Sequence, residues 1–150
     1  MISFVSKNFQ ALTTEELYII LALRAEVFVV EQNCPYQDVD GKDVDSIHLL
    51  GFIDNELMAY ARILKPGISY KDYASIGRIV ISPKKRGNSY GHELVSYSIN
   101  QCKESFVGQP IKISAQSHLE KFYSAHGFLP TGEAYLEDGI PHIAMIYNKK

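Results

Sequence analysis

Cysteine is scarce in this chain, where Cys34 and Cys102 are the only two among 150 residues. Two cysteines without metal-ligand spacing exclude a disulfide framework and a cysteine-based metal site. So few thiols are typical of a reducing compartment. We therefore expect a cytoplasmic protein that holds no metal ion.

Long apolar runs and an excess of basic charge are also absent. No apolar stretch approaches the roughly 20 residues of a membrane-spanning helix, and the N-terminus lacks the basic and apolar segments of a signal peptide. The formal net charge is −2, so no overall positive field draws the chain to nucleic acid or to an anionic membrane. We predict that the chain binds neither.

What the chain does have is the composition of a folded domain, with 46% hydrophobic and 21% charged residues. No internal repeat, low-complexity tract or linker divides it. A chain of this length removes about 70% of its unfolded surface from water when it folds, which is enough for one core. We expect residues 1–150 to form a single domain.

Apolar periodicity predicts strands and helices that alternate along the chain. Thr13 and Glu16 have the spacing of a capping box, and Asp138-Gly139 suits a type I′ hairpin turn. The order predicts an α/β layered domain with a mixed, mostly antiparallel sheet. Strands are expected at about residues 2–9, 47–53, 57–64, 75–81 and 111–115 and on both sides of Asp138-Gly139, and helices at about residues 14–30, 91–106 and 118–125.

Residues 31–46 are predicted to form a long loop, because they contain Pro35, Gly41 and several aspartates. The pattern departs from a calcium-binding EF-hand loop, since its glycine is misplaced and the final glutamate is missing. The carboxylates could favour a cationic acceptor at a cleft, or they could be ordinary solvated side chains. They belong to Asp38, Asp40, Asp43 and Asp45.

The strand predicted over residues 75–81 runs into a basic turn, Lys84-Lys85-Arg86, which leads through Gly87 into the next helix. Such a turn aims unpaired backbone N–H groups and the positive end of the helix dipole at one place. This arrangement favours a phosphate or pyrophosphate. A solvated basic turn is the plain alternative.

Several separate segments together resemble the GCN5-related N-acetyltransferase (GNAT) superfamily and, within it, the ElaA-type subgroup. Residues 79–91 and 122–128 carry the superfamily resemblance, which spans nearly the whole chain. It implies a twisted, mostly antiparallel sheet of about six to seven strands flanked by about four helices. The subgroup-like segments are Val27-Phe28-Val29-Val30-Glu31-Gln32, Cys34-Pro35-Tyr36, Ala59-Tyr60-Ala61-Arg62 and Glu137-Asp138-Gly139-Ile140-Pro141-His142.

The resemblance implies acetyl-CoA as the co-substrate, with its pantetheine arm paired to the end of the 75–81 strand. The superfamily turn reads Arg/Gln-x-x-Gly-x-Gly/Ala; Arg86 and Gly91 match it, whereas Ser89 replaces the first glycine. A serine at positive φ would be strained by roughly 1 to 2 kcal/mol. The implied cofactor-binding residues are Ile79, Ile81, Arg86, Gly87, Asn88, Ser89, Tyr90, Gly91, Gln116 and Tyr123.

By the same resemblance, Tyr123 is the general acid and the backbone N–H of Ile81 is the oxyanion donor. Without the resemblance, Tyr123 would more often be a core aromatic. A lysine-like amine is only about one part in 10³ neutral at neutral pH, so a base or a water relay is needed. The candidate bases are Glu31, His48, His118 and His142, and the candidate acceptor-binding residues are these four and Arg62.

Structural alternatives stay open for several of these side chains. His48 lies in an apolar strand, where a structural histidine is the more common case. Arg62 and Arg78 lie in predicted strands and could form ion pairs with loop aspartates.

The leading functional prediction is transfer of an acetyl group from acetyl-CoA to a primary amine by direct attack. The acceptor could be a small amine or a peptide amine. A non-catalytic acyl-CoA-binding or sensing module is the alternative, and an acyl-homoserine-lactone synthase is a third. The exposed edge of the last hairpin allows either a monomer or a homodimer.

Overall fold

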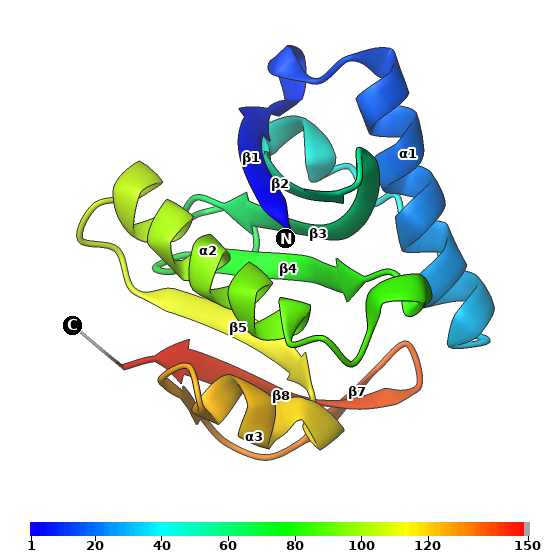
Figure 1. Ribbon diagram of the computed structural model, residues 1–150. Coiled ribbons are helices and arrows are strands. Elements are labelled where there is room, and N and C mark those ends of the chain that lie inside the picture. Colours follow the sequence, from blue (N-terminus) through cyan, green and yellow to red (C-terminus); the bar gives the residue numbers. More distant parts are fainter. Residues whose placement is uncertain (149–150) are drawn as a thin grey trace.

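The computed structural model describes residues 1–148, which fold around one twisted, open sheet (Figure 1). The strand order is β1-β2-β3-β4-β5-β8-β6, and β7 pairs with β8. Neighbouring strands are antiparallel except for β4 and β5, which are parallel. The strands are β1 (Ser3–Asn8), β2 (Ile47–Ile53), β3 (Glu56–Leu64), β4 (Ala74–Ile81), β5 (Ile111–Gln116), β6 (Phe128–Pro130), β7 (Tyr135–Glu137) and β8 (Ile140–Tyr147).

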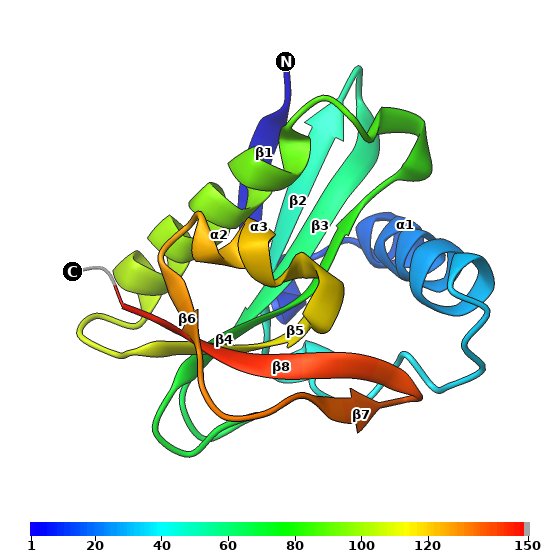
Figure 2. The same cartoon turned by 90° about the horizontal axis from the view of Figure 1, so that it is seen from below.

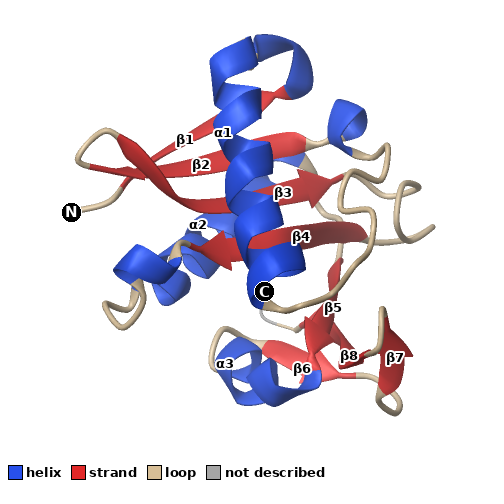
Figure 3. Cartoon of the chain, turned by 90° about the vertical axis from the view of Figure 1, so that its right-hand side faces the viewer, coloured by secondary structure: helices blue, strands red, loops and turns tan. Residues whose placement is uncertain are grey.

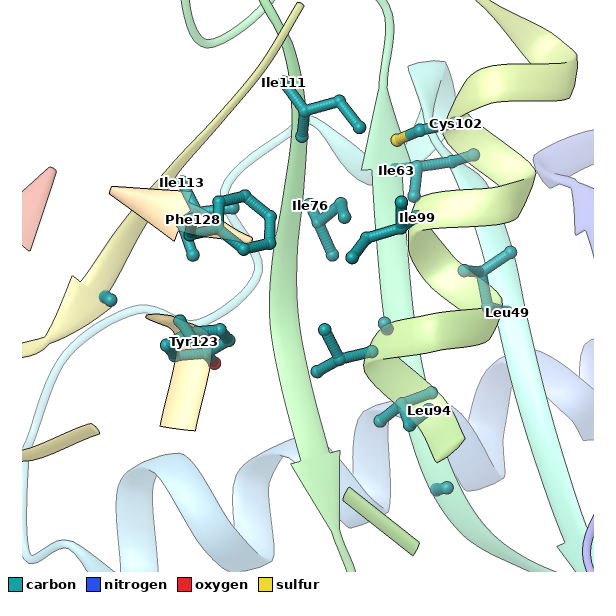
Figure 4. Close-up of a cluster of buried hydrophobic side chains, with 14 of the residues drawn as sticks. Leu49, Ile63, Ile76, Leu94, Ile99, Cys102, Ile111, Ile113, Tyr123 and Phe128 are labelled. Atoms are coloured by element: carbon teal, nitrogen blue, oxygen red, sulfur yellow. The ribbon is translucent and has the colours of Figure 1, made fainter. Parts of the chain in front are cut away.

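The helices cover both faces of this sheet. The first, α1 (Thr14–Arg24), lies on one face, while α2 (Tyr90–Ser105) and α3 (Glu120–Ser124) lie on the other (Figure 2 and Figure 3). Each face buries its own apolar core. The larger core lies under α2 and includes Leu49, Ile63, Ile76, Leu94, Ile99, Cys102, Ile113, Tyr123 and Phe128 (Figure 4); the smaller one lies under α1 and comprises Ile20, Leu23, Val27, Leu50, Tyr60 and Val80.

The predicted capping box starts α1. The side chain of Thr13 accepts from the backbone N–H of Glu16, and the Glu16 carboxylate accepts from the N–H of Thr13. The predicted continuation to residue 30 is also present, but η2 (Ala25–Glu31) is π-helical. Wide turns of this kind are frequent at functional sites. Here η2 carries Phe28 and Glu31, which line the cavity beside the end of β4.

A β-bulge in β4 reverses the alternation of its side chains. Gly77 pairs with Arg62 and Val80 pairs with Tyr60. Residues 78 and 79 of β4 therefore lie opposite a single β3 residue, at position 61, and Arg78 has a φ of 50°. The bulge turns Val80 towards α1 and leaves Ile79 on the α2 face.

The parallel strands β4 and β5 separate after a short contact. Only Ala74 and Ser75 of β4 pair with β5, at Ile111 and Lys112. Beyond them the two strands part towards their carboxyl ends (Figure 1). The second half of β4 therefore has β3 on one side and an open edge on the other.

The predicted fold class is confirmed, with differences in detail. The sheet has eight strands, and the residues described form three α-helices. The strand that was not predicted is β6, which has three residues and ends at Pro130. Three residues are too few to display an alternating pattern.

The loop of residues 31–46 is present, but three of its four aspartates are not ordinary solvated side chains. Asp38 and Asp43 are buried, and the side chain of Asp40 is 24% exposed. They form an arginine–aspartate cluster with three arginines that point from α1, β3 and β4. The ion pairs join Arg24 to Asp38 and Asp43, Arg62 to Asp40 and Asp43, and Arg78 to Asp38 and Asp40.

Replacing Asp43 with asparagine tests this cluster. Its carboxylate Oδ1 lies 2.7 Å from Nη1 of Arg24 and 2.9 Å from Nη1 of Arg62. Since breaking a buried ion pair leaves an uncompensated charge, Asp43→Asn is expected to lower the free energy of unfolding by about 3 kcal/mol. Asp45→Asn, at an exposed neighbouring carboxylate, should change it by less than about 0.5 kcal/mol. Urea unfolding measures both, and equal effects would contradict the account.

The pH dependence of that variant has a defined sign. Burial alone would raise the pKa of Asp43, but hydrogen bonds and charges from Arg24 and Arg62 outweigh burial and lower it. A lowered folded pKa gives stability that is complete above the unfolded value of about 3.9 and is lost as the pH falls below it. The wild type should therefore lose more stability than Asp43→Asn between about pH 5 and pH 2.

Ser89 gives a second stability test. It precedes α2 in the left-handed region, with φ 63°, and its side chain makes no capping hydrogen bond. Ser89→Gly should raise the free energy of unfolding by about 0.5 to 1 kcal/mol, because glycine adopts this conformation without strain. Ser96→Gly makes the same change at an exposed position inside α2 and should lower it by a similar amount. Chemical denaturation measures both changes in the free energy of unfolding. If the two changes had the same sign, backbone strain at Ser89 would be contradicted.

Candidate active site

The open edge of β4 borders a large cavity of about 840 Å³. The end of β4, the turn of residues 84–91, the start of α2, the residues leading into α3 and the last turns of η2 all contribute walls. Of the predicted cofactor residues, those that line it are Ile79, Ile81, Arg86, Gly87, Ser89, Tyr90, Gly91, Gln116 and Tyr123.

Backbone donors of β4 face this cavity. The N–H of Ser82 donates to the carbonyl oxygen of Met58 in β3, at 2.7 Å. Because successive N–H groups along a strand point to opposite edges, those of Ile79 and Ile81 point to the open edge. The carbonyl of Ile81 points the same way, and it accepts from Nε of Arg86 at 3.2 Å.

The start of α2 supplies further donors. Gly87 and Ser89 both have positive φ values, of 86° and 63°, which fold the turn back towards the strand. No side chain caps the first N–H groups of α2, a helix of 16 residues. An uncapped N-terminus of this kind attracts an anion through its free donors and its dipole. A Cβ on Gly91 would lie 3.4 Å from the ring of Phe122, an ordinary van der Waals distance, so α2 and α3 are neighbours at this point.

Arg86 and Glu31 form a two-pronged ion pair at this cavity, joining η2 to the 84–91 turn. Nη1 and Nη2 of Arg86 each lie 2.7 Å from one carboxylate oxygen of Glu31. Both side chains are more than 40% exposed. Hydrogen bonding to Arg86 lowers the pKa of Glu31, and the same contact raises that of Arg86. In this arrangement the arginine donors are engaged by a carboxylate that an anionic ligand could displace.

A second, small cavity of about 130 Å³ adjoins the large one, and residues of the 31–46 loop contribute to its wall. Phe28, Gln32, Ile79, Gln116, Leu119, Tyr123 and Ile140 line both, so the two cavities form one continuous cleft. The residues found only in the small cavity include Cys34, Tyr36, Arg78, Ser114, Glu137 and His142.

Tyr123 stands where the two cavities meet. It comes from α3 and is 7% exposed, and its ring lies edge-on to Phe122 and Phe128 at centroid distances of 5.1 and 6.1 Å. Burial raises the pKa of its hydroxyl to about 12. Tyr123 is therefore a fixed, neutral hydrogen-bond donor at the centre of the cleft.

The structure does not bring every predicted residue to the cleft. His48 and Arg62 line neither cavity. His48 is fully buried between the hydroxyl of Tyr60 and the carbonyl of Asp43, and burial lowers its pKa. The guanidinium of Arg62 is ion-paired within the arginine–aspartate cluster. His48 is therefore a structural histidine and Arg62 an ion-paired arginine, as the structural alternatives had it. Asn88 also lies off the cavity walls, and its amide donates to the carbonyls of Lys85 and Arg86.

Glu31, His118 and His142 do lie in the cleft: Glu31 and His118 line the large cavity, and His142 lines the small one. Sequence reasoning missed Ser114 and Glu137, which lie beside His142. Ser114 alternates with the buried Ile113 on β5, which marks a polar face opposite the core.

The chain belongs to the GNAT acetyltransferase family. Residues 14–149 match the family model described as an acetyltransferase (GNAT) domain. The chain is 45% identical to Protein ElaA of Escherichia coli K12 over 97% of its own length and 95% of that protein.

Solved structures agree with this assignment. The crystal structure of Escherichia coli ElaA has a TM-score of 0.92 and 43% identity to this chain. The match covers 99% of this chain and 100% of that one. An acyl-CoA N-acyltransferase from Pseudomonas aeruginosa has a TM-score of 0.93 and 42% identity, with the same 99% and 100% coverage. The acyl-homoserine-lactone synthase LasI is 15% identical with a TM-score of 0.78, covering 97% of this chain and 89% of that one, so it shares the fold alone.

Substitutions at the Glu31–Arg86 pair test the large cavity as an acyl-CoA site. Glu31→Gln removes a carboxylate that competes for Arg86, so the dissociation constant of acetyl-CoA should fall by up to about five-fold. Arg86→Glu should raise it by at least about ten-fold, because a charged hydrogen-bond donor is replaced by a repelling charge. Glu133→Gln, an exposed carboxylate that lines neither cavity, is the matched control. Isothermal titration measures all three; weaker binding by Glu31→Gln would contradict the competition.

Proposed function

We propose that this protein is an acetyl-CoA-dependent N-acetyltransferase that acts as a single domain and transfers the acetyl group directly to a primary amine. One observation carries the proposal: the open edge of β4 and the uncapped start of α2 face one cavity. A strand edge suits the amides of a pantetheine arm, and a helix N-terminus suits a diphosphate. Acyl-CoA carries both groups in series.

The proposal gives each group at this cavity a role. The backbone N–H groups at the start of α2 bind the diphosphate, supported by Arg86 once Glu31 has been displaced. The N–H groups of Ile79 and Ile81 pair with the pantetheine arm or meet the thioester oxygen. A fixed backbone donor at a developing oxyanion contributes about 3 to 4 kcal/mol.

Tyr123 acts on the leaving sulfur. With a pKa of about 12, its hydroxyl is a much weaker acid than a thiol of pKa about 8.5, so complete proton transfer to the thiolate is uphill by about 5 kcal/mol. Its contribution is therefore a hydrogen bond that stabilises the departing thiolate. The acceptor reaches the thioester from the small cavity, on the other side of Tyr123.

Replacing Tyr123 with phenylalanine tests this role. Tyr123→Phe should lower kcat by about 10² to 10⁴ while leaving the dissociation constant of acetyl-CoA nearly unchanged, because the hydroxyl acts on the transition state. Tyr97→Phe is the matched control: that hydroxyl bonds to Ser6 and lines neither cavity. Release of the free thiol of CoA is followed with a panel of primary amines.

The outcomes separate the enzyme from a binding module. Full turnover in Tyr123→Phe would reject the role of the tyrosine. Tight binding of acetyl-CoA by the wild type without amine-dependent CoA release would favour a non-catalytic acyl-CoA-binding module. Absence of both would reject the proposed function.

A further inference from the structure

Each of the four candidate bases now has a defined position. Glu31 is bound to Arg86 through both carboxylate oxygens, and His48 is buried away from the cleft. His118 lines the large cavity. Only His142 of these four lines the small cavity, from which an acceptor would approach.

One hydrogen bond of His142 fixes its tautomer. Nδ1 lies 2.7 Å from the carbonyl oxygen of Ile140. Because a carbonyl oxygen only accepts, Nδ1 carries the hydrogen, and the neutral ring has its lone pair on Nε2. His142 is therefore held in a form that can accept a proton at Nε2.

A carboxylate lies next to that lone pair. Oε2 of Glu137 is 3.5 Å from Nε2 of His142. Ser114 donates to the other oxygen of Glu137 at 3.2 Å, and the ring of Tyr135 stacks on His142 with an interplanar angle of 24°. Two acceptors that face each other are complementary to a cationic N–H donor.

We propose that His142 accepts the proton of an alkylammonium acceptor and that Glu137 is a positioning residue that stabilises the resulting imidazolium. The proposal rests on the proposed function and deepens it, since it names the base and the residue that positions it. A primary ammonium entering the small cavity can donate to Nε2 of His142 and to the carboxylate of Glu137.

The transfer step balances with these groups. The ammonium loses one proton to Nε2 of His142, and the freed lone pair of nitrogen forms the bond to the thioester carbon. The carbon–sulfur bond then breaks with its electron pair on sulfur. The second nitrogen proton goes to that sulfur, so the products are the amide, the thiol of CoA and a protonated His142, which returns its proton to solvent.

The other charged groups around His142 do not replace this pair. Arg78 in β4 is ion-paired with Asp38 and Asp40, and the thiol of Cys34 donates to the carbonyl of Asp138. The titratable and charged side chains that face the small cavity with His142 are Cys34, Tyr36, Arg78, Tyr123, Glu137 and Asp138.

Two amines of similar shape test the base. Ethylamine is almost entirely protonated at neutral pH, whereas trifluoroethylamine is largely neutral and needs no base to expose its lone pair. His142→Gln should lower kcat/KM by about 10² or more with ethylamine and by less than about five-fold with trifluoroethylamine. The control His118→Gln should change the two values by equal factors.

Equal losses with both amines in His142→Gln, or no loss, would overturn the assignment of the base. The wild type is assayed with the same amines. If it releases CoA, the proposed function stands whatever the result for His142→Gln. If the wild type releases no CoA with these two amines or with any other amine of the panel, transfer to a primary amine itself is rejected.

Glu137→Gln supplies a test that does not depend on the folding of a histidine variant, because Glu137 is 48% exposed. Glu137 stabilises the imidazolium that forms when His142 takes the proton, so its loss should lower kcat/KM by about ten-fold or more with ethylamine and by less than about three-fold with trifluoroethylamine. Glu133→Gln removes the same charge at an exposed position that lines neither cavity, and should leave both values in place. Equal losses with the two amines in Glu137→Gln would overturn the role of Glu137.

Discussion

The short pairing between β4 and β5 is the constraint on which the rest of the structure depends. Two β4 residues pair with β5, and the strands then part. Their separation leaves the N–H and C=O groups of the last β4 residues without a neighbouring strand, next to the start of α2. A continuous sheet would use those groups for its own hydrogen bonds, and it would close the cleft in which Tyr123 lies.

Two other features keep the separated strands in place. The bulge at Gly77 and Arg78 sets which way the last residues of β4 face, and the arginine–aspartate cluster ties that bulge to α1, β3 and the 31–46 loop. The cluster is costly to desolvate, so its value is positional: a buried charge that loses its partner is strongly unfavourable. The same loop carries Cys34 and Tyr36 to the small cavity. The bulge and part of the wall of the small cavity are thus held by one set of contacts.

Much of this could be predicted from the sequence where the signal is local. The Thr13–Glu16 capping box, the Asp138-Gly139 turn and the basic turn before α2 each depend on a few adjacent residues, and each is present. The family was also predictable, because separate segments resemble it in the right order. The hairpin register places Tyr135 opposite His142 and Glu137 two positions along, on the same face, so the Glu137–His142 contact was within reach of the same reasoning.

What could not be predicted depends on residues far apart in the chain. The ion pair between Glu31 and Arg86 and the participation of Arg24 in the arginine–aspartate cluster arise from tertiary packing. The burial of His48 and the ion pairs of Arg62 and Arg78 were among the structural alternatives, but the sequence could not choose between them and a role in the site. The π-helical form of η2 also has no local sequence signal that distinguishes it from an α-helix. The left-handed Ser89 shows the opposite case, in which local preference disfavours a conformation that the fold imposes.

The most direct measurement is amide hydrogen exchange over residues 79–91 with and without saturating acetyl-CoA. The account predicts that exchange at Ile79 and Ile81 and at the first residues of α2 slows when the ligand is present, while exchange in the edge strand β1 stays the same. Unchanged exchange at Ile79 and Ile81 in a sample saturated with acetyl-CoA would contradict it.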